Sequence, residues 1–432
     1  MMTAGVHEEQ RATSQEVAGK SAGPLVALLT GGVDRPYAFG LAMALAAKGL
    51  RLDFIGSDDL DRPEIRSVPE VRFLNLRGDQ RYSAPATTKI RRVLSYYARL
   101  LRYGWAAETP VFHILWNNKF ETLDRTFLMV YYKVCGRKVA LTAHNVNAAV
   151  RDAKDSLVNR LTLRSQYRLA DHIFVHTEKM KADLLTGFGV PPDRVTVVPF
   201  GLNSSVPNTS LTPGEAKRRL GIQDGAKTIL FFGRIGPYKG LHLLVEAFRR
   251  LAQRDDRYRL IIAGEVAPEH ATYFADIERE IEAVTVRDRI IRRIEFIPDE
   301  HTEHYFKAAD VLVLPYTDVF QSGVLFLGYN FGLPVVAADV GSLKDDIVEY
   351  ETGLLTRPRD SEHLAEVLAT YFDSDIFRHL DARRESIRAY AAARHSWDVV
   401  AGMTLRAYDT LEFGSRWRQS SHSRPRSKEH VS

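Results

Sequence analysis

The first half of the chain alternates short apolar runs with longer segments in which apolar residues recur every three or four positions. The short runs predict buried strands, and the longer segments predict helices. The seven predicted strands cover residues 25–30, 51–55, 71–76, 111–116, 138–142, 172–176 and 195–199. A regular alternation of strands and helices favours a parallel sheet with helices on both faces.

This alternation stops at residues 202–214, LNSSVPNTSLTPG, a Ser-, Thr-, Pro- and Asn-rich segment that is typical of a linker. Beyond the linker the same pattern starts again. The second set of predicted strands covers residues 228–232, 260–263, 294–297, 311–314 and 335–337. A repeated α/β pattern on either side of a linker predicts two doubly wound domains.

The boundaries of the parts follow from these patterns. We expect a disordered tail at 1–22, a first domain at 23–203, a second domain at 204–398, a helix at 399–414 and a disordered basic tail at 415–432. Both tails are polar and have too little apolar surface to form a core.

Length and composition agree with this division. A chain of 432 residues with 45% hydrophobic and 26% charged residues is typical of a globular protein with more than one domain. The net charge of +5 does not by itself indicate a partner. The single cysteine, Cys135, excludes an internal disulfide and fits a reducing compartment. No apolar run reaches the roughly 20 residues of a membrane span, and residues 1–22 lack the apolar block of a secretion signal, so we expect a cytoplasmic protein.

The segment 229–248, ILFFGRIGPYKGLHLLVEAF, carries the clearest chemistry. A buried strand is followed by a glycine-rich loop and then by a core-facing helix, an arrangement that directs backbone N–H groups and a positive helix end at an anion. The loop adds two cations, Arg234 and Lys239, and no acid lies between them. We interpret it as a phosphate site; the alternative is an ordinary turn with solvated charges. No Gly-Lys-Ser/Thr follows, which disfavours a P-loop ATPase.

This loop resembles that of the retaining glycosyltransferases of the GT-B fold, family 4, and the resemblance continues through Pro298, Tyr316 and residues 332–341. It implies an α/β protein of GT-B type, with two doubly wound, Rossmann-like domains that face a central cleft. The second domain would bind a nucleotide sugar and the first an acceptor. Arg234 and Lys239 would hold the diphosphate of the donor, and the last helix would cross back to the first domain.

Further polar residues follow other predicted strands, where ligands of open parallel sheets bind. Gly32, Glu265 and Tyr316 occupy such positions and are predicted donor contacts. His144, in the segment TAHN, resembles the family's histidine that hydrogen-bonds the donor sugar; the alternative is a loop histidine satisfied by backbone groups. No other His, Cys or Asp has a metal-like spacing to His144, so we expect no metal ligand and no cofactor.

The residues Gln321, Ser322, Gly323 and Val324 precede a predicted helix, whose free N–H groups would bind an anion. The alternative is a simple N-cap by Ser322. Here the chain departs from the family, whose members carry two glutamates eight positions apart. Counted back from the glycine at 332, the second glutamate falls on Leu327 or Gly328 and the first near Val319 or Phe320. The candidate acids to replace them are Asp345, Asp346 and Glu349.

A predicted helix at 88–107 has Ile90, Val93, Leu94, Tyr97 and Leu101 on one face. Its arginines, on nearly the opposite face, are Arg91, Arg92, Arg99 and Arg102. A surface helix packed by its apolar side explains the stripe, whereas the arginines favour peripheral contact with anionic lipid on the inner face of a membrane. Both interpretations stay open. Nucleic acid is disfavoured because no recognised binding module accompanies the helix.

Together these features predict a hexosyltransferase that moves a sugar from a UDP- or GDP-sugar to an acceptor hydroxyl with retention and without a metal. His144, Arg234 and Lys239 are its predicted catalytic residues. The acceptor would be a carbohydrate or a lipid-linked molecule in polysaccharide or glycoconjugate biosynthesis. The alternative is a catalytically weak nucleotide-sugar-binding or scaffold protein of the same fold, which the missing glutamates favour.

Overall fold

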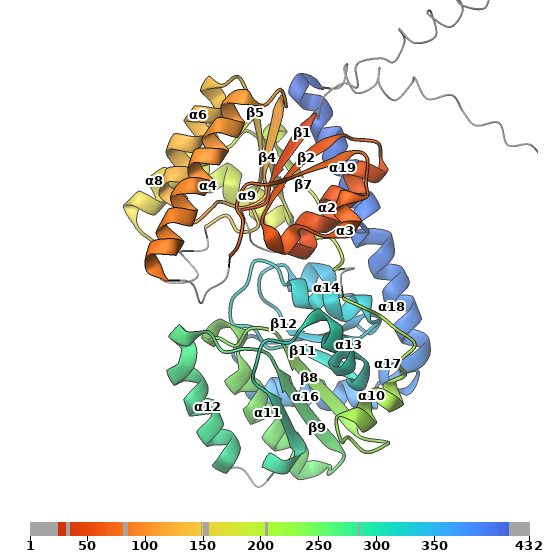
Figure 1. The fold of residues 1–432 in the computed structure, drawn as a ribbon. Coiled ribbons are helices and arrows are strands. Elements are labelled where there is room, and N and C mark those ends of the chain that lie inside the picture. Colours follow the sequence, from red (N-terminus) through yellow and green to blue (C-terminus); the bar gives the residue numbers. More distant parts are fainter. Residues whose placement is uncertain are drawn as a thin grey trace, which may run out of the picture.

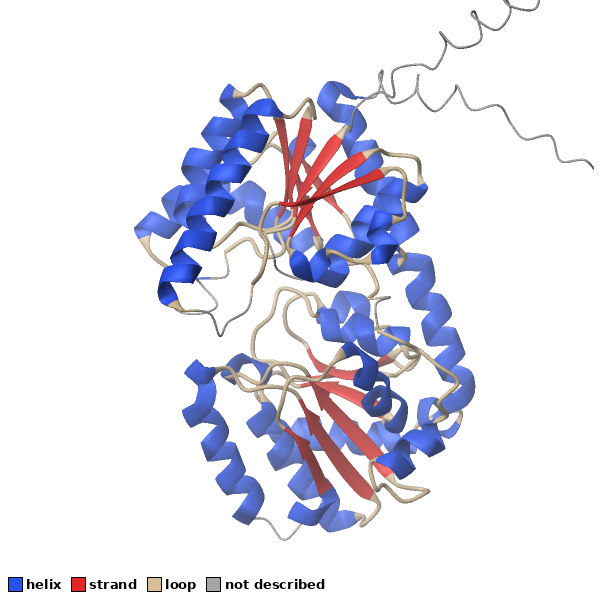
Figure 2. Ribbon diagram, viewed as in Figure 1, coloured by secondary structure: helices blue, strands red, loops and turns tan. Residues whose placement is uncertain are grey.

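The structure, a computed structural model, consists of two α/β domains joined side by side by the chain and by its last helices (Figures 1 and 2). It describes residues 25–31, 35–80, 85–147, 149, 155–203, 206–283 and 286–413. The predicted donor contact Gly32 and the predicted tails at 1–22 and 415–432 lie outside the described residues.

The first domain contains a seven-stranded parallel sheet with the order β3-β2-β1-β4-β5-β6-β7. Its strands are β1 (Val26–Leu29), β2 (Leu52–Gly56), β3 (Val71–Asn75), β4 (Val111–Ile114), β5 (Lys138–Thr142), β6 (His172–Val175) and β7 (Val195–Val197). All seven predicted strands are confirmed. The strand order reverses direction at β1, and the crevice at such a switch point is where doubly wound sheets bind ligands.

Helices cover both faces of this sheet. One face packs against α2 (Arg35–Ala47), α3 (Pro63–Arg66) and the last helix of the chain. The other face packs against α4 (Ala86–Ala106), the π-helical turn η2 (Asp124–Leu128), α6 (Met129–Val134), α8 (Leu157–Leu169) and α9 (Glu178–Phe188). The short helix α5 (Glu121–Leu123) directly precedes η2. Short 3-10 turns, η1 (Asp58–Leu60) and η3 (Pro192–Arg194), complete the connections.

The second domain contains a six-stranded parallel sheet with the order β10-β9-β8-β11-β12-β13. Its strands are β8 (Lys227–Phe232), β9 (Tyr258–Ala263), β10 (Ile290–Arg293), β11 (Val311–Leu314), β12 (Val335–Ala338) and β13 (Gly353–Thr356). The helices on one face are α10 (Pro213–Arg219), α13 (Asp299–Ala308), α14 (Gly323–Asn330) and α18 (Leu380–His395). Those on the other face are α11 (Leu241–Arg254), α12 (Ala271–Ala283), α16 (Ser361–Asp373) and α17 (Asp375–Arg378). The remaining elements are α15 (Leu343–Asp346), η4 (Pro237–Lys239), η5 (Pro268–His270) and η6 (Arg287–Arg289).

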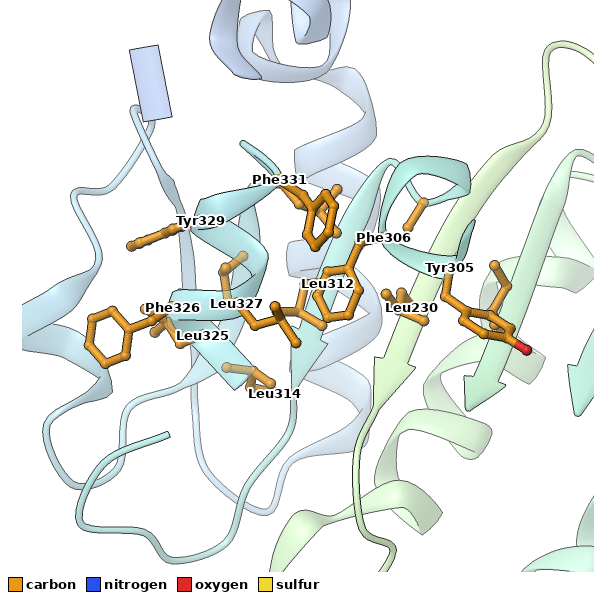
Figure 3. Packing of buried hydrophobic residues seen from close by; sticks show 14 of the residues in the cluster. Leu230, Tyr305, Phe306, Leu312, Leu314, Leu325, Phe326, Leu327, Tyr329 and Phe331 are labelled. Atoms are coloured by element: carbon orange, nitrogen blue, oxygen red, sulfur yellow. The ribbon is translucent and has the colours of Figure 1, made fainter. Parts of the chain in front are cut away.

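Figure 3 shows how this second core positions α14. Leu312 and Leu314 of β11 contact the apolar face of α14, while Phe306 of α13 fills the space beside Leu230 of β8. Burial of large side chains of this kind contributes roughly 1.5–3 kcal/mol each. The core therefore holds the N-terminus of α14 at a fixed place beside the ends of the strands.

One predicted strand is wrong. Residues 294–297 form no strand, and the strand lies four residues earlier, at Ile290–Arg293. It is the edge strand of the sheet, so Arg292 and Arg293 can remain at its surface, and the sequence pattern of a buried strand is weak there. Phe296, which suggested a buried run, is 69% exposed.

The chain returns to the first domain at its end. Helix α19 (Trp397–Tyr408), followed by the π-turn η7 (Asp409–Phe413), buries Val400 and Ala401 in the core beneath α2. The hydroxyl of Tyr408 lies 2.6 Å from Nδ1 of His113 on β4.

The chain passes between the domains twice, near Leu202 and between His395 and Trp397, and the two segments are hydrogen-bonded to each other. The backbone N–H of Leu202 donates to the carbonyl of His395, and the indole N–H of Trp397 donates to the carbonyl of Leu202. The Trp397 ring fills the space beside Gly40 and Gly201, where a Cβ on either glycine would come within 2.6 Å of the ring. We call this group the crossing knot.

Candidate active site

A cavity of about 440 Å³ lies between the two domains, at the ends of their strands. The first domain lines it with Tyr37, Trp116, His144, Asn145 and His176, and the second domain with Tyr238, Lys239, Tyr316 and residues 321–324. Seven of the residues expected from the sequence therefore lie at one cavity: His144, Lys239, Tyr316, Gln321, Ser322, Gly323 and Val324.

Lys239 is the cation of this cavity in the second domain. Its side chain is buried, and Nζ donates a hydrogen bond of 2.7 Å to the hydroxyl of Tyr316. Nζ also lies 4.5 Å from the centre of the Tyr316 ring. Because Lys239 donates to the phenol oxygen, the Tyr316 O–H is free to donate to Oγ of Ser322, 3.2 Å away. The three side chains thus form one polar row along the cavity wall.

The glycine after Lys239 makes this row possible. Gly240 has a φ of +67°, and a Cβ there would lie 2.0 Å from the carbonyl oxygen of Pro315. Both the backbone conformation and the close approach therefore require glycine. The loop consequently lies directly against the end of β11 and brings Lys239 to Tyr316.

Arg234 and Glu265 lie outside the residues that line the cavity. Their side chains are 65% and 41% exposed, and Nη2 of Arg234 lies 3.0 Å from Oε1 of Glu265. An exposed ion pair of this kind contributes about 0–1 kcal/mol to stability. The pair satisfies the charge of Arg234 within the protein, and the predicted contact of Arg234 and Glu265 with the donor stays a prediction.

The N-terminus of α14 meets the cavity. The side chain of Ser322 makes no capping hydrogen bond, so the alternative of a simple N-cap by Ser322 is wrong; its Oγ contacts Tyr316 instead. Gly323 and Val324, the first two helical residues, line the cavity, and N–H groups in a first turn have no acceptor within the helix. This helix end offers N–H donors and positive potential to an anion.

The positions of the two missing glutamates also lie at the cavity. Val319 and Leu327 both line it, whereas a Cβ on Gly328 would point at Leu312 in the core. Of the two candidates for the second position, Leu327 is therefore the one that faces a ligand. The apolar side chains of Val319 and Leu327 therefore line the cavity at the two positions where the resemblance implies carboxylates.

The acids proposed to replace them lie elsewhere. Asp345, Asp346 and Glu349 are absent from the cavity wall. Burial raises the pKa of Asp346 to about 7, and the amide of Gln321 opposes that rise. Gln321 lines the cavity, and its buried Oε1 makes no hydrogen bond within the described chain.

His144 is held from three sides. Its ring stacks on Trp116 with 4.1 Å between the ring centres and an angle of 6°, and the edge of Tyr37 packs against it at 4.8 Å. Nδ1 of His144 lies 3.0 Å from Nε2 of His176, and Nδ1 of His176 lies 3.2 Å from the carbonyl oxygen of Val198. Burial lowers the pKa of His176 to about 4 and that of His144 well below its usual value, so both rings are neutral at pH 7.

These contacts decide where the protons are. The Val198 carbonyl can only accept, so the proton of neutral His176 is on Nδ1 and its Nε2 is an acceptor. His144 must then donate from Nδ1, which leaves its own Nε2 without a proton. That buried Nε2 makes no hydrogen bond in the part of the chain that the structure describes.

The aromatic part of the site was not predicted. Tyr37, Trp116, Phe200 and Trp397 come from four distant segments and meet only in the fold. A weak signal existed for His176, since it ends the apolar run of β6 and is followed by the polar segment TEKMK.

A second cavity of about 540 Å³ adjoins the first within the first domain. The two cavities share Trp116, His144 and Asn145. The second one is lined by side-chain amides, of which Asn117 and Gln166 bond to each other, with 2.7 Å from Gln166 Nε2 to Asn117 Oδ1. Amides that both donate and accept are suited to the hydroxyl groups of a polyol or sugar.

A cation, Arg125, also lines this second cavity. Nη1 of Arg125 donates to Oδ1 of Asn159 at 2.9 Å, and Nη2 contacts Glu121. The buried Nε of Arg125 makes no hydrogen bond among the described residues. Among all the residues that the structure describes, no group of three or more His, Cys, Asp or Glu side chains could hold a metal ion.

Comparison with known families decides the identity of the chain. Residues 30–206 match the model described as Glycosyltransferase Family 4, and residues 214–394 match that of Glycosyl transferases group 1. The chain belongs to glycosyltransferase family 4. The expected recognition and the GT-B fold class are therefore confirmed.

Relatives of the chain include proteins named D-inositol 3-phosphate glycosyltransferase. The chain is 31% identical over 244 residues to the D-inositol 3-phosphate glycosyltransferase of Corynebacterium efficiens, which covers 54% of this chain and 57% of that protein. It is 25% identical over 419 residues to the enzyme of the same name from Kribbella flavida, with coverage of 89% and 95%. The chain thus spans less than two thirds of the length of the first of these relatives.

Solved structures show the same fold. Sucrose-phosphate synthase from Thermosynechococcus elongatus superposes with a TM-score of 0.69 at 20% identity, covering 93% of this chain and all of that one. The Anabaena protein HepE, in a complex with UDP and glucose, gives a TM-score of 0.68 at 17% identity, with coverage of 90% and 99%.

Proposed function

We propose that this glycosyltransferase moves a hexose from a nucleoside-diphosphate sugar, a UDP- or GDP-sugar, to an acceptor hydroxyl with retention of configuration. The observation that carries the proposal is the position of Lys239. It is a buried cation at the same cavity as the N-terminus of α14 and His144. Relatives named for glycosyl transfer, and a structural neighbour solved with UDP and glucose, support this assignment.

The donor's diphosphate would lie between Lys239 and the N–H groups of Gly323 and Val324. As the bond between the anomeric carbon and the phosphate oxygen breaks, negative charge develops on the leaving diphosphate. A fixed ammonium group and a helix N-terminus stabilise that charge without a metal ion. Because the row from Lys239 to Ser322 is already ordered, little reorganisation is needed during the reaction.

The donor sugar would lie against His144, whose Nε2 can only accept a hydrogen bond and so suits a sugar hydroxyl. Nε2 is covered in this structure, so the contact requires a shift of the ring. The acceptor would occupy the amide-lined cavity, which meets the donor cavity at His144 and Trp116.

In the transfer step, an acceptor oxygen forms the new bond to the anomeric carbon. The acceptor proton passes to the oxygen of the leaving diphosphate on the same face of the sugar. This step needs no carboxylate nucleophile, which agrees with the apolar residues Val319 and Leu327 at the cavity wall. We place the reaction in polysaccharide or glycoconjugate biosynthesis with a carbohydrate or lipid-linked acceptor.

One observation favours a second candidate function. With Val319 and Leu327 in place of carboxylates, the cavity lacks the two side chains that the resemblance assigns to donor recognition. The alternative is therefore a nucleotide-sugar-binding protein of the same fold with weak turnover. Tyr238, Lys239 and Gly240 retain the transferase-like loop and favour the enzyme.

The experiment is a donor screen with the purified full chain in the presence and absence of EDTA. UDP and GDP release from a panel of nucleotide sugars would be measured with simple sugars and inositol phosphate as acceptors, and the anomeric configuration of the product by NMR. Release that depends on both donor and acceptor, and that persists in EDTA, supports the proposal. Thermal stabilisation by a donor without release under any acceptor supports the binding protein instead.

A further inference from the structure

The first domain has an unusually apolar outer surface on α4, the segment 120–134 and α8. Of the thirteen exposed large apolar side chains in the described part of the chain, eleven lie on these three segments. They include Trp105 on α4, Phe127 and Val134 on the middle segment, and Leu157 on α8, all between 51% and 76% exposed. Single exposed apolar residues are ordinary, but a contiguous group of this size indicates an interaction surface.

The three segments lie next to one another on the outside of the sheet (Figure 1). The hydroxyl of Tyr131 donates to the carbonyl of Leu101, which joins the middle segment to α4. Arg125 donates to Asn159, which joins the middle segment to α8. We call this continuous surface the outer helical face.

The prediction that α4 packs by its apolar stripe is wrong in part. Tyr97 is buried, but Ile90 and Leu94 of the same predicted stripe are 61% and 63% exposed. The helix is rotated because the hydroxyls of Tyr96 and Tyr97 hydrogen-bond inward, to Asn118 and Asp124. Ile90 and Leu94 therefore lie at the surface of the domain, although the apolar pattern of the helix alone predicts that they are buried.

Cations accompany this apolar surface. Helix α4 carries five basic residues and α8 three, and neither has an acid. Two of the predicted lipid-facing arginines are engaged within the domain: Arg92 pairs with Asp79, and Arg99 donates to the carbonyl of Leu76. Arg91 and Arg102 are exposed on the same helix as Ile90 and Leu94.

On α8, Arg164 and Arg168 are likewise exposed, on the same side of the helix as Leu161. Leu161 and Arg164 stand at the edge of this surface, where they also line a groove shared with α9 and residues 318–320 of the second domain. Both outer helices therefore combine exposed apolar side chains with positive charge. An apolar surface flanked by cations matches the chemistry of an anionic bilayer, whose headgroups attract arginine while its acyl region accepts aromatic and aliphatic side chains.

We propose that the outer helical face binds the surface of an anionic lipid bilayer. A second copy of the chain fits less well, because α4 and α8 would bring like charges together. The outer helical face also lies next to the proposed acceptor cavity. Glu121, Arg125 and Asn159 of these segments also line the amide-lined cavity, so its mouth opens beside the face. A lipid-linked acceptor could extend its head group into that cavity while its chains stay in the bilayer.

The test is vesicle sedimentation with the full chain and no donor or acceptor, so its result is independent of the proposed reaction. We expect binding to phosphatidylcholine vesicles with about 30 mol% phosphatidylglycerol, at least about tenfold weaker binding to pure phosphatidylcholine, and weakening with salt. Arg91→Glu with Arg164→Glu should reduce the binding to anionic vesicles by about tenfold or more.

The apolar variant is Phe127→Ser, Val134→Ser and Leu157→Ser, and its matched control is Phe296→Ser with Tyr350→Ser, which are equally exposed but lie on the second domain. The apolar variant should lose about tenfold in vesicle affinity and the control less than about twofold. Thermal melting confirms that each variant is folded. Absence of vesicle binding by the parent chain, or unchanged binding by the apolar variant, would overturn the proposal. So would a dimer in sedimentation velocity that the apolar variant abolishes, because the face would then bind a second copy.

Discussion

Nε2 of His176 lies 3.0 Å from Nδ1 of His144. This contact fixes the proton of His144 on Nδ1 and leaves its Nε2 unprotonated and without a hydrogen bond among the described residues. His176 is itself fixed by the carbonyl of Val198. The hydrogen-bonding character of His144, which we propose meets the donor sugar, is therefore set by a second histidine at the end of the neighbouring strand β6.

The first prediction concerns this positioning residue. His176→Phe keeps a ring of similar shape but removes the acceptor, so His144 can adopt either tautomer. We expect about a tenfold loss in kcat/KM for the donor, comparable to the loss of one neutral hydrogen bond. The 15N shifts of the His144 ring, which report its tautomer directly, should change from one form to a mixture.

Its matched control is His172→Asn. His172 is also buried on β6, where it bonds Thr196 and does not line the cavity. This control should destabilise the protein without changing the His144 spectrum. An unaltered tautomer in His176→Phe would refute the positioning role even if activity fell.

The second prediction separates the two cations of the glycine-rich loop. Lys239 lines the cavity, whereas Arg234 is exposed and paired with Glu265. We expect Lys239→Ala to reduce kcat by about 10²–10³-fold, the usual cost of one preorganised charge-stabilising group. Arg234→Ala should cost clearly less.

Steady-state kinetics on both variants checks this order. The control is Arg279→Ala on α12, an exposed arginine paired with Asp276, which should have wild-type activity. Equal losses for Lys239 and Arg234 would mean that Arg234 leaves Glu265 and enters the cavity when the donor binds.

The third prediction restores a missing carboxylate. Leu327 lines the cavity at the position where the resemblance places the ribose-binding glutamate. Leu327→Glu should tighten UDP or GDP binding several-fold, about 1–2 kcal/mol for a charge-assisted hydrogen bond, measured by isothermal titration calorimetry. Leu327→Met, of similar volume and without charge, is the control. Weaker nucleotide binding in the glutamate variant would show that the nucleotide adopts another pose.

The fourth prediction concerns the amide-lined cavity. Asn117→Ala breaks the reciprocal pair with Gln166 and removes a group that we assign to the acceptor. The KM for the acceptor should rise about tenfold, because two neutral hydrogen bonds are affected, while donor binding stays unchanged. Thr186→Ala on the exposed side of α9 is a control that should alter neither constant. A selective rise in the donor KM would contradict the assignment.

The fifth prediction is acid sensitivity. Burial lowers the pKa of His113 to about 3 and those of His172, His176 and His395 to about 4, below the 6.5 of an unfolded histidine. Between pH 6.5 and 4 the unfolded chain therefore binds more protons, so the free energy of unfolding falls as the pH falls through this window. Asp346 acts in the opposite sense, since its pKa is raised to about 7 and it favours the folded state at lower pH.

Burial also raises the pKa of Asp124 and Asp310 and lowers that of His144. The buried histidines outnumber the carboxyls with a raised pKa, and we expect the melting temperature to fall continuously from pH 7 to pH 4.5. Differential scanning calorimetry in buffers of equal ionic strength measures it. His172→Asn removes one of the titrating groups and should make the slope shallower. A melting temperature that is level over this range would exclude protonation of the buried histidines as the cause of acid unfolding.

Much of the fold could be predicted because strands with two neighbours are nearly pure apolar runs. Strands β1, β2, β4, β5 and β6 have two neighbours in the first sheet and are mostly buried, whereas β10 is an edge strand that ends in Arg292 and Arg293, and the prediction places it four residues late. Strand β13, of sequence GLLT, is the other edge strand of the second sheet and was not predicted. Edge position weakens the sequence signal of a strand, since fewer of its side chains must be buried.

The site divides along similar lines. Lys239 could be predicted because strand, loop and helix are consecutive in the chain. The stacking of Trp116 on His144, and the contact of His176 with it, could not, because they depend on how separate strand ends meet. The exposure of Ile90 and Leu94 was also hidden: a helical wheel shows which residues share a face but not the rotation of the helix against its sheet.

The crossing knot has a mechanical consequence. Both connections between the domains pass through Leu202, His395 and Trp397 and are hydrogen-bonded to each other. They therefore form one hinge rather than two separate linkers. Sliding of the two domains apart would break both connections at once. Such an attachment allows the cavity between the domains to widen and narrow around a ligand while the two domains keep their register.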